Sequence, residues 1–163
     1  MLWMFFLKKD CIMSHQSPSL EFLIGSHLLK VGELDLFLTY SQAFLINKEV
    51  SKNWCKKTLS ERINWYLKNV SASLPESYNF KSLLEKLKDD HVDLRNLLAH
   101  SCLSFNVDSQ DLTLQRVFGS PETISIAELI RKVKDLDLLK KEIIQSIADL
   151  CSQATEERKK NET

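Results

Sequence analysis

Three side chains suited to work on a phosphodiester lie close together in the sequence: Arg95, Asn96 and His100. A guanidinium can donate two parallel hydrogen bonds to phosphate oxygens. An imidazole titrates near neutral pH, so it can take up or release a proton. Asparagine can orient a neighbour or hydrogen-bond a substrate. On RNA, such a group could promote attack of the ribose 2′-hydroxyl on the adjoining phosphate, with arginine stabilising the charged transition state. This chemistry needs no metal and no organic cofactor.

The spacing of these residues sets a geometric condition, because each residue of an α-helix turns by about 100°. Asn96 and His100 are four positions apart and share a face, whereas Arg95 and His100 lie about 140° apart. Arg95 and His100 should therefore converge only if the backbone leaves α geometry near Ala99, or if a second copy of the chain supplies the missing partner. A predicted helix end at this point favours the first option.

Apolar periodicity predicts four helices, and the three residues lie at the end of the third. The helices cover residues 20–46, 54–73, 79–98 and about 126–152. The first is apolar over more than one stripe and needs partners on two sides. The third has apolar positions at alternating steps of four and three, which place His91 on the seam as a buried histidine. His27, in the first helix, has no predicted partner.

The period changes after the third helix. Residues 102–107 and 112–118 alternate in part between apolar and polar side chains, with Asp108-Ser109-Gln110-Asp111 between them, which predicts a short β-hairpin. Ser125 and Glu128 have the spacing of a capping box, so the last helix should begin there. The predicted fold class is all-α: an antiparallel four-helix bundle with a short β-hairpin inserted before the last long helix.

Composition favours one folded domain and removes several classes of function. The 163 residues include 22 basic and 22 acidic side chains, so the chain as a whole has no charge that would attract a polyanion. Between Lys48 and Lys68 six basic residues accompany two acidic ones, and we expect this mildly basic face to be solvated. Three glycines are too few for a phosphate-cradling loop. The four cysteines form no C-x-x-C pair and predict reduced thiols, with no zinc site.

The chain is predicted to comprise an N-terminal arm at 1–19, a helical unit at 20–155 and a polar tail at 156–163 that frays. The apolar opening MLWMFFL is short for a secretory signal and has no positive charge before it. The first residues are either a loosely ordered arm or the product of a start upstream of Met13. Charges interrupt the most apolar segment, 20–46, so we expect no membrane span and a cytoplasmic protein.

The arginine, polar residue and histidine at 95, 96 and 100, within an all-helical layout, resemble the signature of the HEPN-domain family. The likeness in helix order covers about residues 20–152. It implies a small helical bundle whose motif lies in a cleft between two subunits. It also implies a metal-independent endoribonuclease, of the kind found in toxin–antitoxin, phage-defence and related stress systems.

In this interpretation His100 transfers protons, Arg95 binds phosphate and Asn96 orients the group. The partners would be a second copy of the chain, an RNA substrate, and an antitoxin or other regulatory protein. Two other functions stay open: a non-catalytic module that dimerises or binds a protein, and a nucleotide-sensing domain that uses the arginine without cleavage. Structural roles are also open, with Arg95 in a surface salt bridge to a neighbour such as Asp90 and His100 as a cation at the helix C-terminus.

Overall fold

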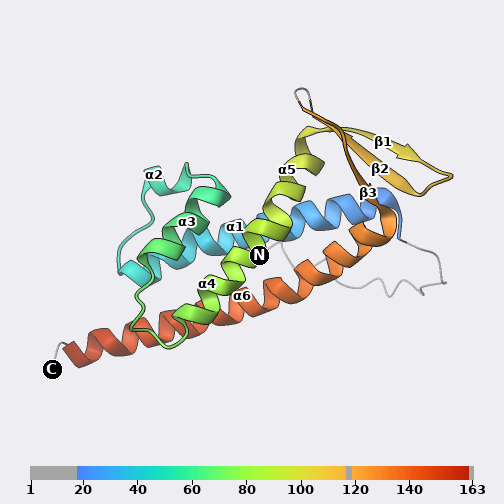
Figure 1. Cartoon of the computed structure of the whole chain (residues 1–163). Coiled ribbons are helices and arrows are strands. Elements are labelled where there is room, and N and C mark those ends of the chain that lie inside the picture. The colour runs from blue at the N-terminus through green and yellow to red at the C-terminus, as the bar shows by residue number, and fades with distance from the viewer. Residues whose placement is uncertain (1–17, 117–118, 162–163) are drawn as a thin grey trace, which may run out of the picture.

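The computed structural model describes residues 18–116 and 119–161, most of which are helical (Figure 1). The elements are α1 (Leu20–Ile46), α2 (Lys52–Cys55), α3 (Leu59–Asn69), α4 (Ser77–Leu87), the π-helical turn η1 (Lys88–Val92), α5 (Asp93–His100), β1 (Cys102–Asn106), β2 (Asp111–Gln115), β3 (Glu122–Ser125) and α6 (Ile126–Asn161). The prediction of a mostly helical chain with strands before the last long helix is confirmed. Of the predicted arm, residues 1–17 lie outside the described residues.

Hydroxyl caps set where the long helices begin. Ser19 caps α1, and the Ser125 hydroxyl accepts a hydrogen bond from the Glu128 amide (3.1 Å), so the predicted start of α6 is confirmed. Thr58 and Glu61 form a complete capping box at α3. This box starts α3 later than the predicted second helix, and the preceding residues form the separate short turn α2.

The predicted antiparallel arrangement is wrong for α1 and α6, which run side by side in the same direction (Figure 1). Three contacts show the shared direction, because residues later in α1 contact residues later in α6. They join Lys30 to Asp137 (3.1 Å), Glu33 to Lys140 (2.5 Å), and the Phe44 carbonyl to Arg158 (2.6 Å). The run from α4 to α5 does oppose α6. Here the later residue of the run contacts the earlier residue of α6: Glu76 contacts Ser146 (2.6 Å), and Asp90 contacts Lys132 (2.9 Å).

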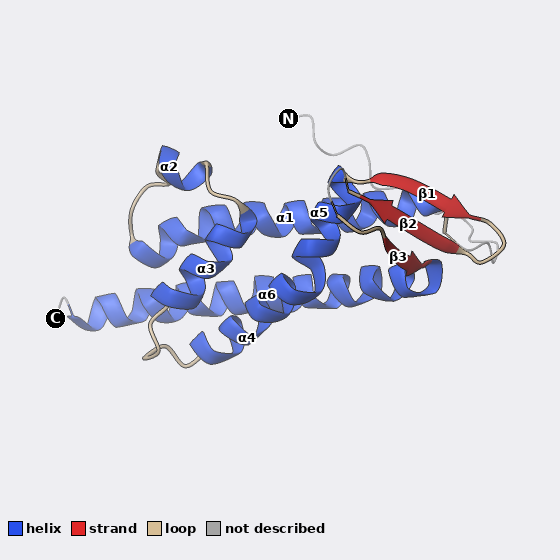
Figure 2. Ribbon diagram, turned by 45° about the horizontal axis from the view of Figure 1, so that its top comes forward, coloured by secondary structure: helices blue, strands red, loops and turns tan. Residues whose placement is uncertain are grey.

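The cause lies in the segment between α1 and α3, which carries α2. The indole N–H of Trp54 donates to the carbonyl of Thr39 (2.8 Å), which fixes this segment against α1. The chain thus returns along α1 before α3 begins, and α3 then runs in the same direction as α1 (Figure 2). Two long helices in succession share a direction, so the up-and-down alternation of a simple bundle is broken.

Two apolar clusters hold the fold together. The larger joins α1, α3, α4 and α6 around residues that include Leu34, Leu38, Ile63, Tyr66, Phe80, Leu84, Leu136 and Leu139. The smaller packs the sheet against one end of the helices, formed by the start of α1, the end of α5 and the start of α6, through Leu23, Leu97, Leu98, Leu112, Leu114, Ile124, Leu129 and Val133. The sheet has three antiparallel strands in the order β1-β2-β3. The predicted hairpin is therefore confirmed, and β3 was missed because four residues are too few to show a period.

The predicted third helix is one continuous run from α4 to α5 that contains the π-helical turn η1. His91 lies in this turn and is buried, as predicted. His27 is also buried, and its Nε2 lies 3.4 Å from Nδ1 of His91, so the expectation that His27 has no partner is wrong. Burial, with the neighbouring positive charge of Lys132 adding to it, lowers the pKa of each histidine to about 4.

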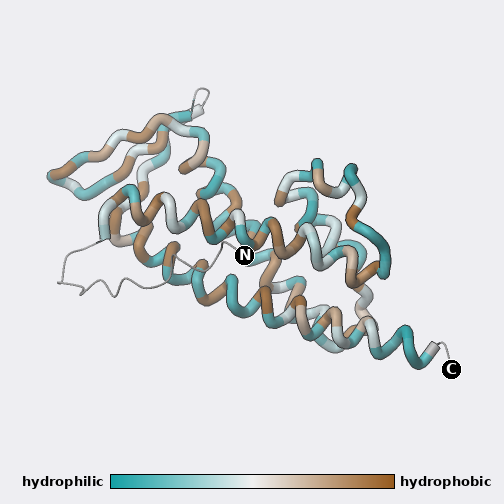
Figure 3. The backbone as a smooth tube through the Cα atoms, turned by 180° about the vertical axis from the view of Figure 1, so that it is seen from behind, coloured by the Kyte–Doolittle hydropathy of each residue, from teal (hydrophilic) through white to brown (hydrophobic). Residues whose placement is uncertain are grey.

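The last helix extends beyond the predicted end near residue 152, and residues 162–163 of the predicted tail lie outside the described residues. Helix α6 continues to Asn161, and its hydrophilic last turns are visible in Figure 3. The Arg158 guanidinium donates to the carbonyls of Phe44 (2.6 Å) and Leu45 (3.2 Å), near the C-terminal end of α1. These contacts explain the extension, because they satisfy carbonyls that a helix end leaves open. No helix in the described part of the chain is both long and apolar enough to cross a membrane.

The buried histidine pair predicts sensitivity to mild acid. In the unfolded chain both rings take up protons near pH 6.5, but in the folded chain only near pH 4. Between these values the unfolded state binds more protons than the folded state. As the pH is lowered through this range, the free energy of unfolding should therefore fall by up to about 1.4 kcal/mol per pH unit for each ring. Urea denaturation between pH 7 and 4.5 measures this slope. The variant His27→Gln/His91→Gln should lose most of it, and an unchanged slope would contradict the prediction.

Candidate functional site

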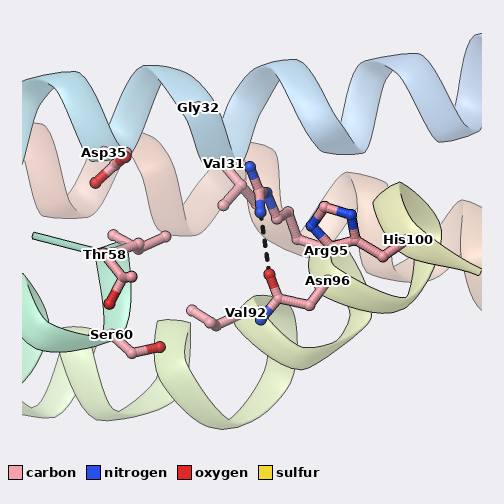
Figure 4. A pocket seen from close by; sticks show the side chains of 10 residues that line it. Val31, Gly32, Asp35, Thr58, Ser60, Val92, Arg95, Asn96 and His100 are labelled. Atoms are coloured by element: carbon pink, nitrogen blue, oxygen red, sulfur yellow. Dashed lines mark hydrogen bonds between the residues drawn. The ribbon is translucent and has the colours of Figure 1, made fainter. Parts of the chain in front are cut away.

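Arg95, Asn96 and His100 line one pocket of about 430 Å³ (Figure 4). The backbone stays α-helical through His100, and the Ser101 amide still donates to the Leu97 carbonyl (3.0 Å). The expectation that the backbone leaves α geometry near Ala99 is therefore wrong. Arg95 and His100 nevertheless border one space, because the long arginine side chain extends across the face of α5 (Figure 4).

The opposite side of the pocket comes from elements far away in the sequence. Its lining residues are Val31, Gly32 and Asp35 from α1, and Thr58, Leu59 and Ser60 from the start of α3, with Val92 of η1 beside the motif. Sequence reasoning missed all of these as site residues. The capping-box spacing of Thr58 and Glu61 could have located the start of α3, but no local signal places that helix opposite the motif.

Arg95 has no acidic partner among the described residues. Its Nη1 donates to Oδ1 of Asn96 (3.0 Å), which holds the two side chains side by side (Figure 4). Asp90, the neighbour considered for a salt bridge, instead binds Nζ of Lys132 (2.9 Å). The surface salt-bridge interpretation of Arg95 is therefore wrong, and most of its guanidinium donors are open to an anion.

The carboxylate in the pocket, Asp35, is paired with Arg62 instead of Arg95. Arg62 is only 4% exposed, and its Nη2 also donates to the carbonyls of Cys55 (3.0 Å) and Trp54 (3.4 Å). The expectation that the basic residues of this segment are solvated is therefore wrong for Arg62. Because Arg62 neutralises Asp35, no carboxylate lining the pocket cancels the positive charge of Arg95.

His100 is exposed at the pocket edge and makes no hydrogen bond or ion pair within the described residues. Its ring is thus free to reach a ligand. No group of three or more His, Cys, Asp or Glu side chains in the described ranges is placed to hold a metal ion. The pocket offers an anion site, a proton donor or acceptor, and an amide.

The paired Arg62 predicts a loss of stability when its charge is removed. Arg62→Leu leaves Asp35 and two carbonyls without their donor, which should lower the free energy of unfolding by about 2 kcal/mol. Urea denaturation measures the difference. The matched control is Arg131→Leu, at an exposed arginine of α6, which should change stability by no more than about 0.5 kcal/mol. Equal effects of the two substitutions would contradict the role given to Arg62.

Comparison of the chain with family models, with curated proteins and with solved structures found no match. The functional argument therefore depends on the geometry and chemistry of the pocket.

Proposed function

We propose that this protein is a metal-independent endoribonuclease of the HEPN type, with Arg95, Asn96 and His100 as its catalytic residues. One observation carries the proposal: the three side chains border one pocket in which Arg95 has no carboxylate partner. A guanidinium with a structural role uses its donors within the protein, as Arg62 does on a carboxylate and Arg158 does on two backbone carbonyls. Arg95 is left with open donors beside an unpaired imidazole, which suits an anionic substrate.

The reaction follows from these groups. The ribose 2′-oxygen attacks the adjoining phosphorus, a general base takes the proton of the 2′-hydroxyl, and the bond from phosphorus to the 5′-oxygen breaks. A general acid protonates the leaving 5′-oxygen, so the products are a 2′,3′-cyclic phosphate and a 5′-hydroxyl. Arg95 stabilises the negative charge that builds up on the phosphate oxygens. Asn96 holds the guanidinium in place through its Oδ1.

One chain supplies one imidazole to this reaction, and we propose that a second copy supplies the other. An apolar stripe of α1 supports dimerisation, because each of its side chains is more than half exposed: Phe22, Leu29, Leu36, Tyr40 and Phe44. Exposed apolar side chains grouped in this way mark interaction surfaces. The stripe lies next to Gly32, which lines the pocket, so a second copy seated on it would approach the site.

The biological setting is part of the proposal. An RNA-cleaving pocket of this kind suits a cytoplasmic toxin or defence component, and a regulatory protein that covers the pocket would hold it inactive. The apolar stripe of α1 also supports the rival function, a non-catalytic helical module that dimerises or binds a protein. Cleavage assays separate the two functions, because the rival predicts none.

Cleavage of RNA tests the proposal directly. The wild-type chain should cut single-stranded RNA in the presence of EDTA and leave 2′,3′-cyclic phosphate ends. His100→Ala should reduce the rate by about 10² to 10⁴, because it removes proton transfer. Arg95→Ala should reduce it by at least about 10², because it removes charge stabilisation in the transition state. Denaturing gels and mass spectrometry of the ends measure both effects.

The matched control for Arg95→Ala is Arg131→Ala, which removes an exposed arginine of α6 that does not line the pocket. It should cleave at the wild-type rate. Cleavage by His100→Ala at that rate, or no cleavage by any form of the chain, would reject the nuclease function.

The proposed dimer has its own test. Leu36→Glu places a charge in the apolar stripe of α1 and should convert the dimer to a monomer, as measured by light scattering, with loss of most RNA cleavage. The control is Leu138→Glu, an equally exposed leucine of α6, which should remain dimeric and active. A monomeric wild-type chain that cleaves RNA would contradict the need for a second copy.

A further inference from the structure

The pocket has two walls with opposite hydrogen-bonding character. On the motif side, Arg95 presents donors for an anion. On the opposite side, Asp35 presents a carboxylate that can only accept, and Ser60 presents a hydroxyl (Figure 4). A phosphate that binds Arg95 would leave the group next to it, in RNA a ribose with its base, to fill the space in front of Asp35 and Ser60.

Arg62 binds one carboxylate oxygen of Asp35, and the other oxygen is available to a ligand. Oδ1 is bound by the buried Arg62, whereas Oδ2 makes no hydrogen bond within the described residues. The side chain remains 36% exposed and faces the pocket. Because the contact with Arg62 fixes the orientation of the carboxylate, Asp35 presents a preorganised acceptor.

Ser60 is the second open group of this wall. No described residue hydrogen-bonds its hydroxyl, although it lines the pocket. Thr58, beside it, is different because its hydroxyl is engaged in the capping box with Glu61 (2.9 Å). Ser60 can therefore contribute a hydrogen bond to a ligand without disturbing the start of α3.

The space between the walls suits a flat ring. The volume of about 430 Å³ falls within the range of about 300 to 1,000 Å³ that is typical of small-molecule sites. Leu59 lines the pocket and is half-buried, so it gives the pocket apolar surface on which a base can pack, whereas Val31 and Val92 are buried behind the lining. Gly32 adds no side chain, and a Cβ built there would meet no atom within 4 Å, so this side of the pocket is open.

A carboxylate facing a base discriminates between the four bases. Guanine, adenine and cytosine carry an amino group on the Watson–Crick edge, which can donate to the free oxygen of Asp35. Uracil carries no amino group, and its two carbonyls flank the single N3–H, so they would face the free oxygen of Asp35, which can only accept a hydrogen bond. A site that leaves buried polar groups unpaired or repelled rejects a ligand strongly.

We propose that Asp35 and Ser60 form a base-recognition subsite that accepts an amino-bearing base next to the cleaved linkage and excludes uracil. This inference rests on the proposed ribonuclease function, whose site it shares. Asp35 acts as the specificity residue, Ser60 adds a second hydrogen bond, and guanine, which has both N1–H and an amino group on one edge, is the preferred base.

Short oligonucleotides with one ribonucleotide in a DNA strand test the subsite, because only that ribose can be cut. Two sets of four substrates are used: one set varies the base on the 5′ side of the linkage, and the other varies the base on its 3′ side. The wild-type chain should cut the guanine substrate at least about tenfold faster than the uracil substrate in one set, since tenfold corresponds to about 1.4 kcal/mol, which a single hydrogen bond to a carboxylate can supply. Equal rates for all bases in both sets would overturn the subsite and leave the nuclease function intact.

Three variants locate the effect. Asp35→Asn keeps an oxygen for Arg62 but adds an amide donor that uracil can accept, so the preference should fall below about threefold. Ser60→Ala should weaken the preference without affecting the fold, and it tests the subsite even if Asp35→Asn is unstable. The control Asp108→Asn, in the turn between β1 and β2, should keep the wild-type preference. A full preference in both Asp35→Asn and Ser60→Ala would overturn the assignment.

Binding separates the two proposals. Guanosine and uridine 3′-monophosphates are titrated against the wild-type and Asp35→Asn chains and followed by NMR. Tighter binding of the guanosine nucleotide, lost in Asp35→Asn, supports the subsite even if no RNA is cut, in which case only the nuclease function fails. Equal binding of both nucleotides to the wild-type chain overturns the subsite.

Discussion

The ion pair between Asp35 and Arg62 is the interaction on which the site depends, because it joins elements that are distant in sequence. Arg62 lies in α3, binds a carboxylate of α1, and donates to the carbonyls of Trp54 and Cys55 in α2. Burying a guanidinium is costly unless its charge is compensated, and here the Asp35 carboxylate and the two carbonyls engage both terminal nitrogens of Arg62. The position of α3 against α1 is therefore constrained, and with it the far wall of the pocket. The same pairing leaves Arg95 without an internal acid.

The sequence predicted the elements better than their arrangement, and the difference has a physical cause. The bounds of α1 and the start of α6 follow from local signals, namely apolar period and a hydroxyl cap. The burial of Arg62 depends on Asp35, 27 positions away, and no local rule pairs them. Likewise, the motif at Arg95 and His100 could be found by spacing, whereas the residues opposite it come from helices whose packing directions are set by long-range contacts. Local information thus defined half of the site.

Helix α1 explains why a simple two-sided bundle was expected and not found. Its apolar residues are distributed around the helix because three different surfaces are needed. One contributes to the core through Val31, Leu34 and Leu38, and one borders the pocket through Gly32 and Asp35. The third carries the exposed stripe that includes Leu36. The spacing of apolar residues along the sequence therefore indicates a helix. It does not show which of the three surfaces packs against other elements of the same chain and which remains exposed.

The π-helical turn η1 accounts for the direction in which the motif points. A π turn places one extra residue in the helical ladder, so every side chain after it is displaced by about 100° from the position that a regular helix would give. Beyond His91 the buried positions follow the predicted seam only in part: Leu98, its last position, is buried as predicted, but Leu94 on the seam is half-buried and Leu97 beside it is buried. Beyond the turn, Arg95 and Asn96 border the pocket. The contact between Nδ1 of His91 and Nε2 of His27 (3.4 Å) joins this turn to α1, and burial, which lowers the pKa of both rings to about 4, keeps the pair neutral near pH 7.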